Sequence, residues 1–366
     1  MQAIPTDSQG EIQIRTENQQ SPVAEEVSAL TAVVRPILEG TLYSVKKVIA
    51  DKLGGFERLT LEMLARVYRP GDGDCGICFE YAIHDAVRRH EGTLLDRLDS
   101  ALTTHCKVPG KETASILFGL EKNGALKLID TARTTLTDES ALLYGTRGRP
   151  ARLKPYIEYV ANAFRRPGAR TALPYSISGI WKTDLFLGHS DSDKWVATTI
   201  KINPTQLQGA KGLRIGIVPT KQGKSDKIYK DESLNLVICP VPHDQAFMQV
   251  FYEGWAIVQQ FIAADAKVPR EVALPRPAHR QVARSLEERR SYPVIDVIEV
   301  LKALGQPELL RTESRTAATI DQRDVAFITR AVVAPMPMVI GKAVRAIPEP
   351  AAREPIGGLF GDQLPK

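Results

Sequence analysis

The chain has 366 residues, of which 43% are hydrophobic and 25% charged, and it carries a formal net charge of +5. This length can bury a sizeable core in two or three structural units. Its apolar stretches are far shorter than the roughly 20 residues that cross a bilayer, and its N-terminus lacks the basic start and apolar run of a secretory signal. Four cysteines make no disulfide framework in so long a chain. We therefore expect a soluble, cytoplasmic protein without a membrane partner.

The first third of the chain is predicted to be helical after a polar, disordered tail at 1–24. Apolar residues recur at helical spacing, and a Gly-Asp turn at 71–74 can cap a further helix. The predicted helices are 24–53 with a break at Gly40, 59–68, and 75–89. Together they define an N-terminal helical region at 25–106 that includes the first helix of the core.

A basic insert is predicted at 107–172. Its sequence favours a helix from Lys111 (ETASILFGLEKNG), then a short strand (ALKLID), then a polar link to a basic segment that ends near Arg170. We expect this insert to form a helical or winged-helix-like module.

Strand signals dominate the next region, a predicted α/β core at 173–265. The strand segments are ISGIWKTDLFLG, KWVATTIKIN, LRIGIVP and LNLVICPVP, and a helix is predicted at 245–264. A C-terminal helical region at 266–331, with a helix at 294–305, precedes a disordered tail rich in Pro and Ala at 332–366. The predicted fold class is mixed α/β, with a central mixed β-sheet flanked by helices.

One predicted β-hairpin carries residues suited to metal chemistry. Asp184 lies in its first strand, and Thr199 and Lys201 lie two residues apart in its second strand, on one face of the sheet. A turn at 188–193 sets Asp184 opposite Thr198 or Thr199. Phosphodiester hydrolysis needs a carboxylate that holds a divalent cation and a positive group near the developing negative charge. Asp184 and Lys201 suit these two roles.

The same residues resemble the signature of the PD-(D/E)XK nuclease superfamily, the fold of many restriction endonucleases. That signature is an acidic residue followed, after a variable gap, by Asp or Glu separated from a lysine by one residue. This chain has Asp184 and then Thr199-Ile200-Lys201. Upstream, Gly76-Ile77-Cys78-Phe79-Glu80 is similar to the family's helix whose glutamate reaches the metal. Downstream, PTQLQGAKGLRIGIVP is similar to the loop and further strand that follow the lysine.

The resemblance implies a restriction-endonuclease-like core and Mg²⁺-dependent cleavage of DNA, with a role in restriction or defence. It implies Glu80 and Asp184 as ligands of Mg²⁺ or Mn²⁺, and the carbonyl oxygen of Ile200 suits the same ion. The implied catalytic residues are Glu80, Asp184, Thr199, Lys201 and Gln206. Thr199 stands where the family usually has a carboxylate, and Thr183 stands where it has proline. A non-catalytic DNA-binding protein with a degraded nuclease-like fold is therefore the alternative function.

Basic residues gather between Gly145 and Arg170, where Glu158 is the one acid. The candidate nucleic-acid contacts are Arg147, Arg149, Arg152, Lys154, Arg165 and Arg166. Arg147-Gly148-Arg149-Pro150 matches the core of an AT-hook, which lies in a narrow minor groove. A second basic run has lysines at 221, 224, 227 and 230. We expect double-stranded DNA as the partner, while RNA, and the choice between a monomer and a homodimer, stay open.

Two other chemistries fit parts of the sequence. Cys75 at the start of a helix, with His189 or His243 as base, suits a cysteine peptidase. A zinc site is a further interpretation, with the ligand set Cys75, Cys78, His105 and Cys106.

A purely structural interpretation of the same residues is also open. Asp184 and Lys201 suit a solvated cross-strand ion pair, and Glu80 with His84 suits an exposed pair one helical turn apart. The basic segment, in turn, suits a solvated helix face.

Overall fold

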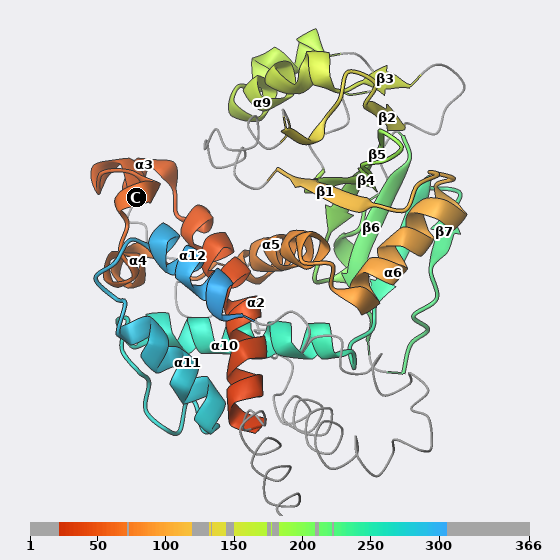
Figure 1. Ribbon diagram of the computed structural model, residues 1–366. Coiled ribbons are helices and arrows are strands. Elements are labelled where there is room, and N and C mark those ends of the chain that lie inside the picture. The colour runs from red at the N-terminus through yellow and green to blue at the C-terminus, as the bar shows by residue number, and fades with distance from the viewer. Residues whose placement is uncertain are drawn as a thin grey trace, which may run out of the picture.

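The computed structural model describes residues 22–305, apart from 72, 119–131, 133, 144–149, 174–176, 178–182, 209–211 and 222. A layer of helices and a mixed β-sheet lie side by side, and helix α5 runs between them (Figure 1). The tail predicted at 332–366, nearly all of the one at 1–24, and the strand predicted in ALKLID fall outside the described residues.

The helical layer is built on α2, a long helix whose residues Leu30, Val34 and Ile37 are almost fully buried. It packs against four other helices (Figure 1). The helices of this half are α2 (Pro22–Ser44), α3 (Lys47–Lys52), α4 (Leu61–Val67), α5 (Asp74–Arg88), α10 (Ala246–Ala263), α11 (Pro277–Glu287) and α12 (Val294–Leu304).

The predicted break at Gly40 is wrong, because α2 continues through this residue to Ser44. A Cβ atom at Gly40 would lie 2.9 Å from the Cα atom of Cys78 in α5. The glycine therefore permits the close approach of two helices and does not end one.

The sheet has the strand order β1-β4-β5-β6-β8-β7. Strands β5, β6 and β8 are parallel neighbours, whereas β1, β4 and β7 pair antiparallel with their partners. Strand β2 pairs parallel with β5 and antiparallel with β3. The strands are β1 (Thr113–Leu117), β2 (Ala141–Leu143), β3 (Ala151–Arg152), β4 (Leu185–His189), β5 (Lys194–Ile200), β6 (Arg214–Pro219), β7 (Tyr229–Asp231) and β8 (Leu236–Val241).

The two faces of the sheet bury two separate hydrophobic clusters, as the period of two along each strand requires. One face, with Leu185, Leu187 and Val196, belongs to the large core that includes α5 and the helical layer. The other, with Phe186 and Trp195, packs with α9 (Ile157–Arg165). Helix α6 (Gly92–Ser100) contacts β1 and β8. Shorter helical turns span Phe56–Arg58, Ala101–His105, Lys154–Tyr156, Pro167–Ala172 and Pro204–Gln206.

The helix predicted from Lys111 is wrong where the structure describes it, because Thr113–Leu117 form strand β1. Its backbone pairs with β4 in the register Thr113↔His189 to Leu117↔Leu185. Tertiary pairing thus overrides the local helical pattern. It also joins the predicted insert to the core, since β1 and β2 both belong to the main sheet.

The coarse fold class, a mixed sheet flanked by helices, is confirmed. The predicted strands KWVATTIKIN, LRIGIVP and LNLVICPVP correspond to β5, β6 and β8, and the helix predicted at 245–264 is α10. Within the described residues, no helix has the length and apolar character needed to cross a membrane.

Candidate active site at the ends of β4 and β5

Asp184 is fixed by backbone pairing at the start of β4. Its N–H donates to the carbonyl oxygen of Thr198 at 2.9 Å, and its own carbonyl accepts from the N–H of Phe118 at 2.9 Å. The register Leu185↔Thr198 sets Asp184 opposite Thr199, one of the two positions that the hairpin count predicts. The residue is buried, with a relative exposure of 3%.

Three donors converge on one oxygen of this carboxylate. Asp184 Oδ2 accepts from Thr199 Oγ1 at 3.0 Å, from the N–H of Ile200 at 2.8 Å, and from Lys201 Nζ at 2.9 Å. Hydrogen bonds to an ionised acceptor are among the stronger ones in proteins, so they orient the carboxylate firmly. Thr199, which replaces the family's usual carboxylate, therefore positions Asp184 through its hydroxyl.

Glu80 approaches the same lysine from α5. Lys201 Nζ lies 3.8 Å from Glu80 Oε1, so the ammonium group stands between two carboxylates. Glu80 and Asp184 are nearly buried, while the Lys201 side chain is 30% exposed and opens the site to solvent. Five residues predicted from sequence thus gather in space: Glu80, Asp184, Thr199, Ile200 and Lys201.

The start of α5 explains how Glu80 is held. Asp74 Oδ2 accepts from the N–H of Gly71 and from the hydroxyl of Tyr68, both at 2.7 Å, and so secures the turn that precedes the helix. Most of the helix beyond Ile77 is buried between the helical layer and the sheet. Packing on both sides gives the helix little freedom to rotate.

Gln206 stands apart from this group. It ends the turn Pro204–Gln206, its side chain is exposed, and its N–H bonds to the carbonyl of Asn203 at 3.0 Å. Among the described residues, no hydrogen bond joins Gln206 to Asp184 or Lys201, and its role in the site stays a prediction.

The interpretation of these residues as two solvated ion pairs is wrong, because both carboxylates are buried. Asp184 and Lys201 do pair, but the carboxylate is buried. His84 bonds through Nδ1 to Ser115 Oγ at 2.8 Å. Burial lowers the pKa of His84 to about 3, with Arg88 and Arg35 adding to the effect, so the imidazole is neutral near pH 7. Glu80 is likewise buried and contacts Lys201.

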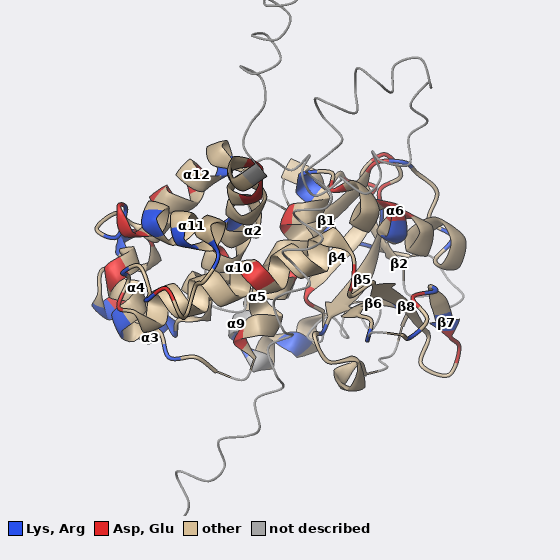
Figure 2. Ribbon diagram, turned by 90° about the horizontal axis from the view of Figure 1, so that it is seen from below, with Lys and Arg blue, Asp and Glu red and all other residues tan. Residues whose placement is uncertain are grey.

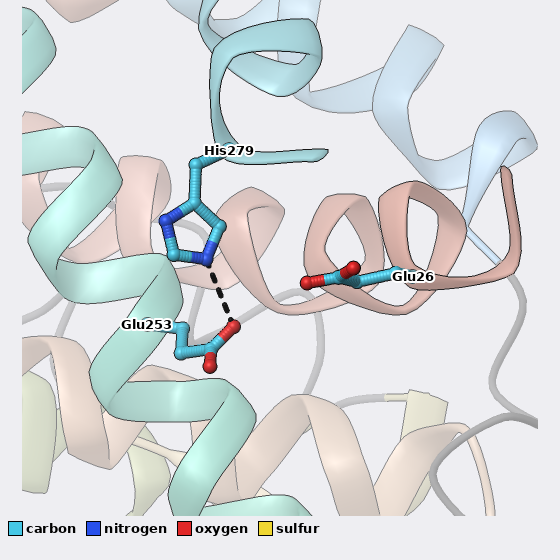
Figure 3. Close-up of side chains that lie close together, drawn as sticks. All are labelled: Glu26, Glu253 and His279. Atoms are coloured by element: carbon cyan, nitrogen blue, oxygen red, sulfur yellow. Dashed lines mark hydrogen bonds and ion pairs between the residues drawn. The ribbon is translucent and has the colours of Figure 1, made fainter. Parts of the chain in front are cut away.

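A second polar cluster, which the sequence did not reveal, joins three helices. Glu26 of α2, Glu253 of α10 and His279 of α11 place ligand atoms within 4.8 Å of one another (Figure 3). Such a group could hold a metal ion, but Arg276 already binds both carboxylates, with Nη1 2.5 Å from Glu253 Oε1 and Nη2 on Glu26. His279 Nε2 lies 3.0 Å from Glu253 Oε2. Glu253 and His279 follow Glu26 by 227 positions or more in the chain, so no short sequence motif marks the cluster.

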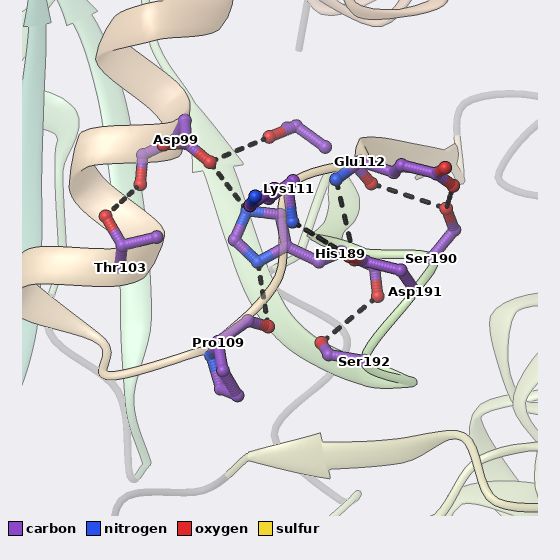
Figure 4. Close-up of polar contacts among 10 residues, drawn as sticks. Asp99, Thr103, Pro109, Lys111, Glu112, His189, Ser190, Asp191 and Ser192 are labelled. Carbon is purple, nitrogen blue, oxygen red and sulfur yellow. Dashed lines mark hydrogen bonds and ion pairs between the residues drawn. The ribbon is translucent and has the colours of Figure 1, made fainter.

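The structure gives the two cysteine chemistries no support. Burial, and secondarily Asp74, raises the pKa of the Cys75 thiol to about 12, the opposite of what a nucleophile needs. His189 is fully buried, with Nε2 2.8 Å from Asp99 Oδ1 and Nδ1 3.1 Å from the Pro109 carbonyl (Figure 4). Within the part of the chain that the structure describes, the proposed zinc ligands do not gather into one group.

The basic segment is described only in part. Arg147, Arg149 and the side chain of Arg165 lie outside the described residues. Arg152 lies 3.0 Å from Glu139 and Lys154 lies 2.9 Å from Asp138, so acids from just before the segment offset two of its charges. The remaining candidate, Arg166, is exposed. Lys and Arg residues are spread over both halves of the molecule (Figure 2). The role of this segment stays a prediction.

Comparison of the chain with protein-family models, with curated proteins and with solved structures finds no match.

Proposed function

We propose that this protein is a metal-dependent nuclease that hydrolyses phosphodiester bonds of DNA at Glu80, Asp184 and Lys201. The observation that carries the proposal is the lysine ammonium between two buried carboxylates from distant segments, one on α5 and one at the β4–β5 hairpin. Burying two acids together is costly unless a cation accompanies them. At this site the cation is a side chain with access to solvent.

The residues present fit a hard divalent cation. Glu80 and Asp184 supply two carboxylates, the ligands that Mg²⁺ and Mn²⁺ prefer. The N–H of Ile200 points to Asp184, and the N–H and C=O of one strand residue point to the same side, so the Ile200 carbonyl faces the site as well. A bound Mg²⁺ would supply Lewis-acid activation of a phosphate oxygen and of the attacking water.

The remaining catalytic roles would fall to side chains of this protein. Asp184 is oriented by Thr199 and by the Ile200 N–H, so one carboxylate is already set in place for the ion. Lys201 moves from the carboxylates toward the phosphate, where its charge stabilises the negative oxygens of the transition state. The order of elements, α5, then the β4–β5 hairpin, then β6, is the order that the nuclease resemblance implies and supports the proposal.

The proposal is tested by cleavage of duplex and single-stranded DNA in a titration of Mg²⁺ and Mn²⁺. We expect Asp184→Asn and Lys201→Ala each to lower the rate by about 100-fold or more, the scale on which transition-state charge stabilisation acts. The controls Asp244→Ala and Lys267→Ala replace exposed residues of the same types and should cleave as the parent does. If the parent binds DNA but cleaves at no metal concentration, the protein is a DNA-binding protein and the nuclease proposal is wrong.

A further inference from the structure

The loop that joins β6 to β7 carries three lysines that have no part in the candidate active site. Lys221, Lys224 and Lys227 are exposed, and none of them forms an ion pair within the described residues. The fourth lysine of this basic run, Lys230, lies in β7 and pairs with Glu232 at 2.7 Å. The loop therefore concentrates three exposed positive charges in a short stretch of chain.

This loop leaves the sheet at the edge that holds the candidate active site. Strands β5 and β6 are parallel neighbours, so both reach this edge with their carboxyl ends. The N–H of Lys201 donates to the carbonyl of Ile217 at 3.0 Å, which sets Lys201 beside Val218. Lys221 follows Val218 by three residues. It therefore lies roughly 10 Å beyond Lys201 along the strands and one strand spacing, about 5 Å, to the side.

Hydrogen bonds hold the loop in place. At its start, Thr220 Oγ1 accepts from the N–H of His243 at 3.0 Å, which ties it to the turn after β8. Further along, Arg97 of α6 donates to the carbonyl of Asp226 and, through Nε, to the carbonyl of Pro240 at 2.8 Å. Arg97 Nη1 also lies 3.3 Å from Asp226 Oδ2 and offsets the acid within the loop. The three lysine charges thus remain uncompensated by Asp226.

The basic segment at 145–170 differs from this loop where the structure describes it. Arg152 and Lys154 are paired with Glu139 and Asp138, so their charges are partly offset. The lysines of the β6–β7 loop are free of such pairs within the described residues. In open α/β sheets, ligands bind outside the carboxyl ends of the strands, where this loop lies. The loop is therefore the better placed of the two for a ligand of the candidate site.

The chemistry of the loop suits a polyanion with regularly spaced charges. A lysine ammonium group has three hydrogen-bond donors and no acceptor, and it binds phosphate as a point charge. The phosphates of one DNA strand are spaced about 3.4 Å apart along the duplex axis. The separation of roughly 10 Å between Lys201 and Lys221 corresponds to about three nucleotides. A strand whose phosphate lies at Lys201 can therefore also reach the loop.

We propose that Lys221, Lys224 and Lys227 bind the DNA backbone that flanks the cleaved phosphodiester. Backbone contacts of this kind position the duplex and carry no sequence information. The place of the loop beside the cleaved bond rests on the proposed nuclease function. The binding of DNA itself rests on the exposed charges and on the fixed position of the loop.

The test is binding of a short DNA duplex to the full-length protein in EDTA, followed by fluorescence anisotropy over a series of salt concentrations. The variant is the triple substitution Lys221→Ala, Lys224→Ala and Lys227→Ala. Each phosphate contact contributes about 0.9 to the slope of log Kd against log salt concentration, so the slope should become less steep by about 2.7. The Kd near physiological salt should rise about tenfold or more.

The matched control is the triple substitution Lys46→Ala, Lys52→Ala and Lys267→Ala. These lysines are also exposed, form no ion pair within the described residues, and lie in the helical half of the molecule. The control removes the same net charge as the loop variant. Its slope should stay within about one unit of the parent's, the effect of a single contact.

Three results would overturn the proposal: no binding of DNA by the parent, an unchanged slope and Kd in the loop variant, or an equal loss in the control. The last would show that net charge, and not the loop, determines binding. In cleavage assays the loop variant should raise KM about as much as it raises Kd. An unchanged KM would place the loop away from the cleaved strand.

Asp184→Asn separates this proposal from the nuclease proposal. Without metal, this variant should bind the duplex with the parent's salt slope, because Asp184 makes no phosphate contact in the loop. A changed slope would contradict the assignment of binding to the loop. If the parent binds DNA through the loop but cleaves at no metal concentration, the loop is a DNA-binding surface and only the nuclease function is wrong.

Discussion

Within the described part of the chain, two places bring a pair of buried carboxylates together with a cationic side chain. At the strand ends, Lys201 meets Asp184 at 2.9 Å and Glu80 at 3.8 Å through a single ammonium group. In the helical layer, Arg276 binds two glutamates through separate nitrogens of its guanidinium group. The difference lies in how firmly the cation is held.

The helical cluster has the properties of a structural ion-pair network that connects helices. The Arg276 side chain is 18% exposed, and its pKa is lowered to about 10 by burial, so it keeps its charge at neutral pH. Burial raises the pKa of Glu253, while the guanidinium beside it favours the ionised form. The guanidinium group of Arg276 already supplies, between the two carboxylates, the positive charge that a metal ion would otherwise bring. The helical cluster is therefore weaker evidence for a metal site than the group around Lys201, whose cation is a solvent-accessible lysine.

The largest effect on stability should come from breaking the helical cluster. Arg276→Ala leaves Glu26 and Glu253 without their cation between α2, α10 and α11. Removing one partner of a buried ion pair typically costs about 3–5 kcal/mol. We expect a loss of this order in the free energy of unfolding in urea. A loss below about 1 kcal/mol, which is what surface ion pairs contribute, would show that the cluster does not stabilise the helical layer.

A smaller effect is expected at the active site from Thr199→Val, which keeps the side-chain shape but removes the hydroxyl that donates to Asp184. A hydrogen bond to a charged group contributes about 1.5–3 kcal/mol. We expect the Mg²⁺ concentration for half-maximal cleavage to rise about tenfold or more. Thr205→Val, at an exposed position, is the control. An unchanged Mg²⁺ requirement would mean that Thr199 does not position Asp184.

Thr199→Glu distinguishes the two roles considered for this position. If the site lacks only a third carboxylate, the substitution should tighten Mg²⁺ binding, as the family pattern implies. If the hydroxyl is needed to orient Asp184, a second anion beside it should instead weaken folding in the absence of metal. Metal titrations and urea unfolding of the same variant measure both effects.

The pH dependence of stability should depend on His279. Burial, with Arg276 and Arg280, lowers the pKa of His279 to about 4. Below the unfolded-state pKa of about 6.5, the unfolded chain binds a proton that the folded chain does not. The stability contributed by neutral His279 is therefore complete above that pH and is lost as the pH falls toward 4. The free energy of unfolding should fall more steeply over this range for the parent than for His279→Gln, and equal slopes would contradict the assignment.

The elements with strong periodicity were predictable from the sequence, and so was part of the site. A run of strand-forming residues after the turn at 188–193 identifies β5. Hairpin counting places Asp184 opposite Thr198 or Thr199, and the structure has Thr199 there. Strand β1 was not predictable, because its five residues form a strand only by pairing with β4. The approach of Glu80 to Lys201 needs tertiary packing of α5, for which the sequence offered only a resemblance. Arg276 and Glu26 are 250 residues apart, and nothing local marks them as partners.

The most direct test of the central claim is Mn²⁺ binding followed by electron paramagnetic resonance in the absence of DNA. Four proteins are compared: the parent, Glu80→Gln, Asp184→Asn and Glu253→Gln. We predict that the parent and Glu253→Gln bind one ion with similar affinity, and that Glu80→Gln and Asp184→Asn each bind it at least tenfold more weakly. If Glu253→Gln loses the ion while Asp184→Asn keeps it, the metal site lies in the helical cluster, and the account of the two sites is wrong.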